Sequence, residues 1–330
     1  MEYFMSLVMC MGELLIDFVA LERGVSVGYA HRFEKAAGGA PANVAVGIAK
    51  LGVSSAFITQ LGNDPFGHYL RDVLAENAVD VSMITFSDEA RTALAFVSVE
   101  ASGERSFAFY RHPSADMLLR PEQLDLERIR QSTIFHYGSI TLIDEPVRSA
   151  TLAAIKAAKS GGAYLSYDPN LREPLWPSLQ AAKIGLIEGL QHANVVKLSE
   201  EELAFLTAGQ SLTTIDAIVH AGRTLWTDEL MLMVVTLGAK GCLAITPSQY
   251  WFVEGYSVPV EDTIGAGDGF VAGLLSGIVE HRLSDLLNDE RMVPLLQRAN
   301  AVGALTTMKR GGIPALPTSD DLILFLTKKN

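Results

Sequence analysis

The sequence predicts an α/β protein with a mostly parallel, doubly wound sheet, helices on both faces and a small second sheet. First, short apolar runs typical of buried strands alternate with amphipathic runs typical of helices, which is the pattern of a parallel sheet. Second, the alternation fails over residues 17–37 and 92–111, where strand-like sequence has no helix after it. Third, 330 residues with 49% apolar content suit one large core with a small appendage.

The expected strands of the core are apolar runs of five to eight residues: Leu7–Met11, Ser55–Leu61, Thr133–Tyr137, Ala163–Tyr167, Ala193–Leu198 and Leu230–Leu237. The expected helices cover 42–52, 64–78, 145–160, 178–191 and 200–208, with a buried helix at 269–278 and a last amphipathic helix at 320–327. Because parallel strands end at the same edge of a sheet, we expect a ligand beyond their carboxyl ends.

The second irregular segment contains a β-hairpin, in which residues 94–99 and 106–111 flank a turn at Ser102-Gly103. Together with the strand-like residues 17–37, this hairpin could form a sheet that covers the ligand as a lid. We therefore divide the chain into an α/β core (1–16, 38–91 and 112–330) and two lid insertions (17–37 and 92–111).

One lid strand carries an arginine on an apolar face. The two-residue period of a strand places Phe107, Phe109 and Arg111 on the same side. The pattern allows two interpretations of Arg111: it contacts the oxygen atoms of a ligand, or it lies on the surface at the end of its strand.

Composition and charge exclude several classes of partner. Acidic residues exceed basic ones by 12 (38 − 26), and no Lys/Arg stripe could follow a nucleic-acid backbone. Cys10 and Cys242 stand in apolar runs, which indicates buried thiols in a reducing compartment. Acidic residues interrupt the apolar N-terminal run, and no later run is long enough to span a bilayer, so we expect a cytoplasmic protein with no membrane partner.

A glycine turn, Asp262-Thr263-Ile264-Gly265-Ala266-Gly267-Asp268, precedes the buried helix. Glycines let the backbone approach an anion, and the free amides and dipole of the helix start stabilise its negative charge, so the turn predicts a phosphate site. An aspartate here could cap the helix. Beside a phosphate site it could instead take the proton from an attacking hydroxyl, and we favour this role for Asp268.

A second glycine segment, Gly38-Gly39-Ala40-Pro41-Ala42-Asn43, leads into the first helix. Helix entry alone explains the glycines and the proline. The amide of Asn43, however, can donate to and accept from neighbouring hydroxyls, and the carboxylate of Asp17, expected at the end of the first strand, can accept from them. At Asp64-Pro65 we expect an N-cap followed by the first residue of a helix.

These two glycine segments resemble the signature motifs of the ribokinase-like (PfkB) carbohydrate kinases. Three longer stretches, 109–118, 167–177 and 311–317, resemble fructokinases within that family. The resemblance covers nearly the whole chain and implies a ribokinase-like three-layer fold. It also implies that ATP, Mg²⁺ and a small-molecule sugar bind, and that the chain forms a homodimer through the lid.

The resemblance also implies roles for individual residues. Asp268 matches the catalytic base, and the amides of Gly265, Ala266 and Gly267 match its anion hole. The expected sugar-binding residues are Asp17, Gly38, Gly39, Asn43, Phe109, Arg111, Arg172 and Asp268. The expected nucleotide-binding residues are Lys197, Ser199, Thr236, Gly238, Gly241, Gly267 and Asn300. For Lys197 the alternative is a solvated side chain.

Two cation sites follow from the same resemblance. The family's Asn-x-x-Glu element corresponds to Ser199–Glu202, in which serine replaces asparagine; Glu202 could organise Mg²⁺ through water, and Ser199 with Glu202 could form a capping box. A K⁺ loop is implied by Asp262 and by carbonyls at or near the following residues: Ile264, Thr306, Lys309 and Gly311. Ala315 stands where ribokinases often have a hydroxyl, so K⁺ dependence stays open.

The expected reaction is D-fructose + ATP → D-fructose 6-phosphate + ADP. Kinases for 2-keto-3-deoxygluconate, ribose or nucleosides remain alternatives, because they would share every catalytic feature. The arginines could serve the carboxylate of 2-keto-3-deoxygluconate as well as a neutral sugar. A non-catalytic sugar sensor is disfavoured by the intact acid and glycine turn. A nicotinamide dehydrogenase is disfavoured because no Gly-x-Gly-x-x-Gly follows the first strand.

Overall fold

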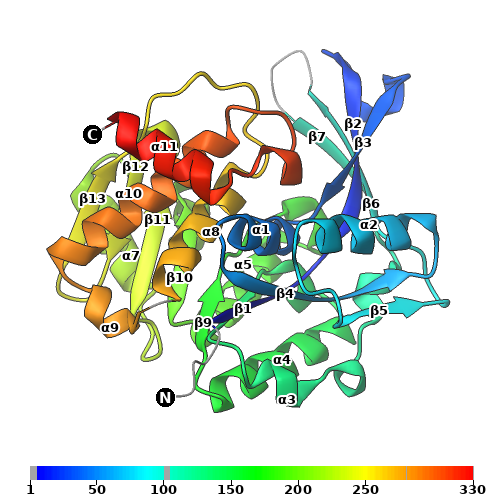
Figure 1. Cartoon of the computed structure of the whole chain (residues 1–330), viewed down its shortest axis with the longest axis horizontal. Coiled ribbons are helices and arrows are strands. Elements are labelled where there is room, and N and C mark those ends of the chain that lie inside the picture. Colours follow the sequence, from blue (N-terminus) through cyan, green and yellow to red (C-terminus); the bar gives the residue numbers. More distant parts are fainter. Residues whose placement is uncertain (1–5, 100–104, 280, 330) are drawn as a thin grey trace.

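A nine-stranded sheet forms the centre of the computed structural model, which describes residues 6–99, 105–279 and 281–329 (Figure 1). Its strand order is β13-β12-β11-β10-β9-β8-β1-β4-β5. The strands pair in parallel except at one edge, where β12 is antiparallel to both β11 and β13. Their bounds are β1 Leu7–Met11, β4 Ser54–Gly62, β5 Ile84–Ser87, β8 Ile134–Tyr137, β9 Tyr164–Tyr167, β10 Val195–Ser199, β11 Leu232–Thr236, β12 Gly241–Ile245 and β13 Tyr250–Glu254.

Helices cover both faces of this sheet, because successive side chains of each strand point to opposite sides. Val8 and Cys10 of β1 belong to one core, and Met9 and Met11 belong to the other. The first core includes residues of α1 Ala40–Lys50, α2 Pro65–Glu76, α8 Ala266–Ile278, α9 Leu283–Leu286, α10 Asp289–Thr306 and α11 Ser319–Lys329. The second includes residues of α3 Leu126–Ile129, α4 Val147–Ser160, α5 Leu179–His192, α6 Glu200–Leu206 and α7 Ile215–Thr224.

A four-stranded sheet of order β3-β2-β6-β7 projects from the core near α1 and α2 (Figure 1). Its strands are β2 Leu15–Arg23, β3 Phe33–Gly38, β6 Leu94–Val99 and β7 Arg105–Tyr110. The hairpin of β6 and β7 is antiparallel, with Val97 opposite Phe107, while the predicted turn at Ser102-Gly103 lies outside the described residues. The division of the chain into core and lid at fixed residue boundaries stays a prediction.

The fold class predicted from the sequence is confirmed, and the six expected core strands appear within two residues of their expected bounds. The predicted place of Asp17 at the end of the first strand is wrong. Asp17 lies within lid strand β2, because the chain turns at Gly12–Leu14 and starts a new strand at Leu15. Cys10 and Cys242 are free and buried, as expected. Every helix in the described part of the chain is too short or too polar to cross a bilayer.

Asp64 fixes the start of α2 to the lid. Its Oδ1 accepts hydrogen bonds from the amides of Phe66 (3.0 Å) and Gly67 (2.9 Å), so the predicted N-cap followed by Pro65 is confirmed. Its Oδ2 accepts from the amide of Thr92 (2.9 Å), just before β6, and Oδ1 also accepts from the Thr92 hydroxyl (2.9 Å). One buried carboxylate therefore holds a core helix and a lid strand together.

We expect Asp64→Ala to lower the free energy of unfolding by about 2–3 kcal/mol, because it leaves the capped amides and Thr92 without their acceptor. Urea titration followed by circular dichroism measures the change. Asp72→Ala is the matched control: Asp72 lies on the same helix but pairs with Arg71 at the surface, and its loss should cost at most about 0.5 kcal/mol. Equal effects of the two substitutions would contradict the assignment.

Candidate active site

An open cavity of about 230 Å³ lies between the lid and the carboxyl edge of the main sheet. Lid and core both line it, and ten sequence-predicted site residues meet there: Asp17, Gly39, Asn43, Phe109, Arg111, Arg172, Ile264, Gly265, Gly267 and Asp268. Gly38 lies beside it, since a Cβ at Gly38 would stand 2.0 Å from Oδ2 of Asp17. A side chain at Gly38 would therefore displace the carboxylate of Asp17.

The floor of the cavity is the start of α8. Gly265, the N-cap residue, has φ 75°, a left-handed conformation that glycine adopts without strain. The amide of Ala266 donates to the carbonyl of Thr263 at 3.4 Å, a long bond, and the first-turn amides that follow have no carbonyl to reach within the helix. The helix start thus presents donors and its positive dipole end to an anion.

A buried ammonium reinforces this anion site. A Cβ at Gly267 would lie 3.3 Å from Nζ of Lys197, so the lysine reaches the helix start from β10. Nζ of Lys197 pairs with Asp168, at 3.1 Å from Oδ2 and 3.4 Å from Oδ1. The interpretation of Lys197 as a solvated side chain is wrong, because it is 7% exposed. Burial lowers its pKa, but the carboxylates of Asp168, Glu202 and Asp268 outweigh this and raise the pKa above the ordinary value, so the ammonium stays charged.

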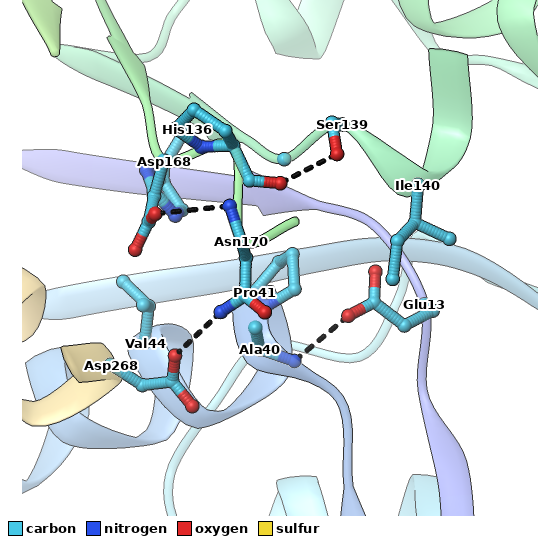
Figure 2. A pocket seen from close by; sticks show the side chains of 12 residues that line it. Glu13, Ala40, Pro41, Val44, His136, Ser139, Ile140, Asp168, Asn170 and Asp268 are labelled. Carbon is cyan, nitrogen blue, oxygen red and sulfur yellow. Dashed lines mark hydrogen bonds between the residues drawn. The ribbon is translucent and has the colours of Figure 1, made fainter. Parts of the chain in front are cut away.

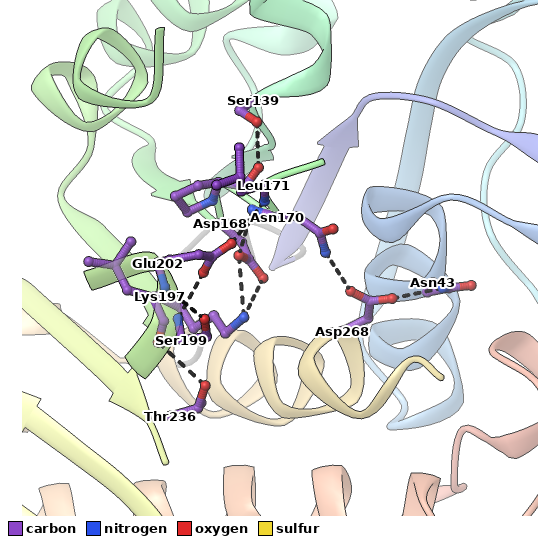
Figure 3. Close-up of polar contacts among 12 residues, drawn as sticks. Asn43, Ser139, Asp168, Asn170, Leu171, Lys197, Ser199, Glu202, Thr236 and Asp268 are labelled. Carbon is purple, nitrogen blue, oxygen red and sulfur yellow. Dashed lines mark hydrogen bonds and ion pairs between the residues drawn. The ribbon is translucent and has the colours of Figure 1, made fainter. Parts of the chain in front are cut away.

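Asp268 is held by two side-chain amides and does not cap its own helix (Figure 3). Its Oδ2 accepts a hydrogen bond from Nδ2 of Asn43 at 2.8 Å, and its Oδ1 accepts one from Nδ2 of Asn170 at 3.4 Å. Burial raises the pKa of Asp268 to about 6, with a further rise from Asp168, while Asn43, Lys197 and Arg172 hold it down. At neutral pH the carboxylate is therefore mostly ionised yet basic enough to accept a proton.

The same two amides have unused acceptors. Because their nitrogens point to Asp268, Oδ1 of Asn43 and Oδ1 of Asn170 are buried, and neither has a hydrogen-bond partner among the described residues. Buried polar atoms are normally paired. Two acceptors beside a carboxylate match a ligand that offers hydroxyl donors.

A small second cavity of about 10 Å³ lies behind Asp268, among Glu13, His136, Asp168 and Asn170 (Figure 2). It has room for about one water molecule. Burial lowers the pKa of His136 to about 3, and its Nδ1 lies 3.0 Å from the hydroxyl of Ser166, so the ring is neutral. This cavity is too small for a sugar.

Glu202 joins the end of β10 to the loop that carries Asp168 and Asn170. The predicted capping box is present: the hydroxyl of Ser199 accepts from the amide of Glu202 (3.1 Å), and Oε2 of Glu202 accepts from the amide of Ser199 (2.8 Å). Oε1 of Glu202 accepts from the amide of Leu171 at 2.9 Å. Both carboxylate oxygens thus accept bonds from backbone amides within this network (Figure 3).

The predicted nucleotide residues Thr236, Gly238, Gly241 and Asn300 do not line the cavity of about 230 Å³. Thr236 ends β11 opposite Ser199, which ends β10. Gly238 (φ 58°) and Gly241 (φ 111°) form the turn into β12. Nδ2 of Asn300 donates to the carbonyls of Val253 and Glu254, at 3.2 Å each, and ties α10 to β13.

The predicted K⁺ loop consists of two segments that lie side by side next to the start of α8. Asp262 accepts from the amide of Ile264 through Oδ1 (3.1 Å) and from the amide of Gly311 through Oδ2 (3.1 Å). The amides of Glu261 and Asp262 both donate to the carbonyl of Thr307. Thr306, fully buried, packs near Gly265, while the role of Lys309 rests on the resemblance.

Arg111 is buried, so its interpretation as a surface side chain is wrong. It is 2% exposed, and its Nε and Nη2 donate to Oδ2 of Asp116 at 2.9 and 2.6 Å. Nearby, Oε1 of Glu13 accepts from the amide of Ala40 at 2.9 Å, and burial raises the pKa of Glu13 to about 7. Burial likewise raises the pKa of Asp17 to about 6, against the opposing charge of Arg172.

Four residues of the site were not predicted from the sequence: Glu13, Asp116, Asp168 and Asn170. Asp116, Asp168 and Asn170 stand inside the fructokinase-like stretches 109–118 and 167–177, so the resemblance contained a signal for them. Glu13 follows the end of β1 by two residues. Because ligands bind beyond the carboxyl ends of parallel strands, this position could have indicated a site residue.

Comparison with known proteins identifies the family. The model of the pfkB family carbohydrate kinases matches residues 5–319. The chain is 51% identical over 320 residues to the probable fructokinase-2 of Arabidopsis thaliana, covering 97% of this chain and 95% of that protein.

Two solved structures share the fold over almost their full length. A fructokinase from Xylella fastidiosa with bound ATP is 35% identical, with a TM-score of 0.88 and 98% of each chain covered. A fructokinase double mutant from Vibrio cholerae O395, with fructose, ADP and potassium bound, is 38% identical, with a TM-score of 0.85 and 98% of each chain covered. The chain therefore belongs to the pfkB family of carbohydrate kinases.

Proposed function

We propose that this carbohydrate kinase is a fructokinase, which transfers the γ-phosphoryl group of ATP to the 6-hydroxyl of D-fructose. The observation that carries the proposal is the buried carboxylate of Asp268. It stands in the first turn of α8, whose helix-start amides suit an anion, and it lines a cavity that contains hydrogen-bonding groups. The near-50% identity to plant fructokinases over nearly the whole chain supports fructose as the acceptor.

The sugar occupies the cavity between the lid and the core. Asp17 and the unpaired amide oxygens of Asn43 and Asn170 accept hydrogen bonds from its hydroxyls. Gly38 leaves room for the carboxylate of Asp17, and a side chain at Gly39 is excluded because its Cβ would strike the carbonyl of Glu13 at 2.3 Å. Phe109, with Phe107 stacked beside it, gives the lid side of the cavity an apolar surface, and Arg172 supplies donors.

ATP binds on the side of the α8 start that faces away from the sugar. The amides of Gly265, Ala266 and Gly267 and the ammonium of Lys197 bind the γ-phosphoryl group, and the turn of Thr236, Gly238 and Gly241 holds the rest of the nucleotide. Ser199 stands beside Thr236, and Asn300 is proposed beside the adenine. This arrangement places the phosphoryl group next to Asp268.

The described residues contain no cluster of three metal-ligating side chains. They therefore fit an Mg²⁺ ion that the phosphates of ATP would hold together with the protein. Mg²⁺ often keeps several waters and takes substrate phosphates as ligands. Glu202, and Asp168 beside Lys197, would hold its waters, and the ion would neutralise charge on the phosphates. For K⁺, we propose the loop of Asp262 with carbonyls at or near Ile264, Thr306, Lys309 and Gly311; the potassium-bound Vibrio fructokinase supports this.

In the chemical step, Asp268 accepts the proton of the 6-hydroxyl as that oxygen attacks the γ-phosphorus. The new O–P bond forms while the bond from the γ-phosphorus to the bridging oxygen of ADP breaks, and the electron pair leaves on ADP. The hydrogen bonds from Asn43 and Asn170 fix the carboxylate for this transfer. Helix-start amides and Lys197 stabilise the charge that develops on the phosphoryl oxygens.

We propose a homodimer through the lid. Outside the sugar cavity the lid carries three exposed large side chains, namely Leu21, Tyr29 and Tyr110. Its sheet ends at β3 and β7, two edge strands whose outer backbone groups could pair with a second lid. Pairing would cover both the apolar side chains and the edges.

Asp268→Asn should lower kcat for fructose by about a hundredfold to ten-thousandfold, because the amide cannot accept the proton. ATP affinity, measured by calorimetry, should stay close to that of the parent, since the helix-start amides remain. The matched control is Asp216→Asn, which changes an exposed aspartate in the first turn of α7 and should leave turnover unchanged. Near-normal turnover of Asp268→Asn would exclude this aspartate as the base.

The kcat/KM for fructose should fall about tenfold per pH unit on the acid side of a pKa near 6, because protonated Asp268 cannot act as a base. Asp17 titrates in the same range, so a variant must identify the group. Asn43→Leu removes a hydrogen bond that favours the ionised form of Asp268, and the acid limb should move to higher pH.

The control for the pH profile is Asn63→Ala, which removes an exposed amide bonded to Asp88 and should leave the limb in place. An acid limb that stays unchanged in Asn43→Leu would show that Asp268 does not determine it.

A further inference from the structure

The arginine in the sugar cavity already has a buried counter-ion. Arg111 lines the cavity, whereas Asp116 does not. Two donors of the guanidinium are taken by one oxygen of Asp116, and both side chains are almost fully buried, at 2% and 3% exposure. The other oxygen of Asp116 accepts from the hydroxyl of Ser114, whose oxygen also lies 3.3 Å from the carbonyl oxygen of Arg111. The geometry of the pair is therefore fixed from behind the cavity.

The acidic groups that line the cavity also outnumber its cations. Its lining has two cations, Arg111 and Arg172, and three carboxyl groups, Glu13, Asp17 and Asp268. Arg172 lies close enough to lower the pKa of both Asp17 and Asp268, and its Nη1 donates to the carbonyl of Leu171. With Asp116 paired to Arg111, neither arginine offers a full uncompensated charge to a ligand.

We propose that Asp116 is a specificity-determining residue that makes the cavity select neutral sugars and reject sugar acids. This inference rests on the proposed function, one alternative to which was a kinase for the acid 2-keto-3-deoxygluconate. The carboxylate of such an acid needs charged donors, and a buried charge without a partner is strongly disfavoured. A neutral hydroxyl needs only one donor or acceptor, which the paired Arg111 still supplies.

The test replaces the charge of Asp116 and keeps its shape. In Asp116→Asn, the ratio of kcat/KM for 2-keto-3-deoxygluconate to kcat/KM for fructose should rise by about tenfold or more, the size expected for a new hydrogen bond to a charged group. The double variant Arg111→Met/Asp116→Asn should lose that gain, because the acid's partner is gone. Calorimetric binding of the two sugars without ATP gives a second readout that does not depend on turnover.

The outcomes separate the inference from the proposed function. If the wild type phosphorylates fructose but the sugar ratio of folded Asp116→Asn is unchanged, or the gain persists in the double variant, the inference fails alone. If the wild type turns over the sugar acid as well as fructose, the inference also fails. If the wild type does not phosphorylate fructose, the proposed function fails, and the binding ratio still tests the inference. Should Asp116→Asn not fold, Asp116→Ser, which retains a polar group for Ser114 and Arg111, takes its place.

Discussion

The buried carboxylate of Asp268 is the constraint on which the rest of the site depends. Removing a carboxylate from water raises its pKa, so the fold has to supply groups that keep it ionised without making it a weak base. Asn43 at the start of α1 and Asn170 after β9 supply hydrogen bonds, and Lys197 on β10 supplies charge. The arrangement of these elements around α8 thus sets the protonation state of the carboxyl group of Asp268.

The same requirement explains the network behind Lys197. An ammonium buried beside the anion site needs a counter-ion when no phosphate is bound, and Asp168 fills that role. Glu202 then fixes the loop of Asp168 through the amide of Leu171. Lys197 is therefore compensated within the protein, and Asp116 does the same for Arg111 in the cavity under the lid.

Much of the fold could be predicted from the sequence, because apolar runs and helical periodicity report burial directly. The antiparallel edge of β12 and β13 was missed, although both strands are rich in apolar residues, because β11, β12 and β13 follow one another without an intervening α-helix and do not fit the strand–helix alternation of the parallel core. Helix α10 was missed because Pro294 and a polar first turn interrupt its pattern. The pairing of Asp168 with Lys197 could not be predicted, because neighbouring strands β9 and β10 bring together residues far apart in the chain.

The central claim is that Asp268 is an ionisable base tuned by its neighbours and not a structural helix cap. The most direct measurement is the titration of its carboxyl carbon by NMR in labelled protein, with Asp268→Asn used to assign the signal. The account predicts a pKa near 6. Titration near the ordinary value of 3.8, with no response to the loss of Asn43, would contradict it.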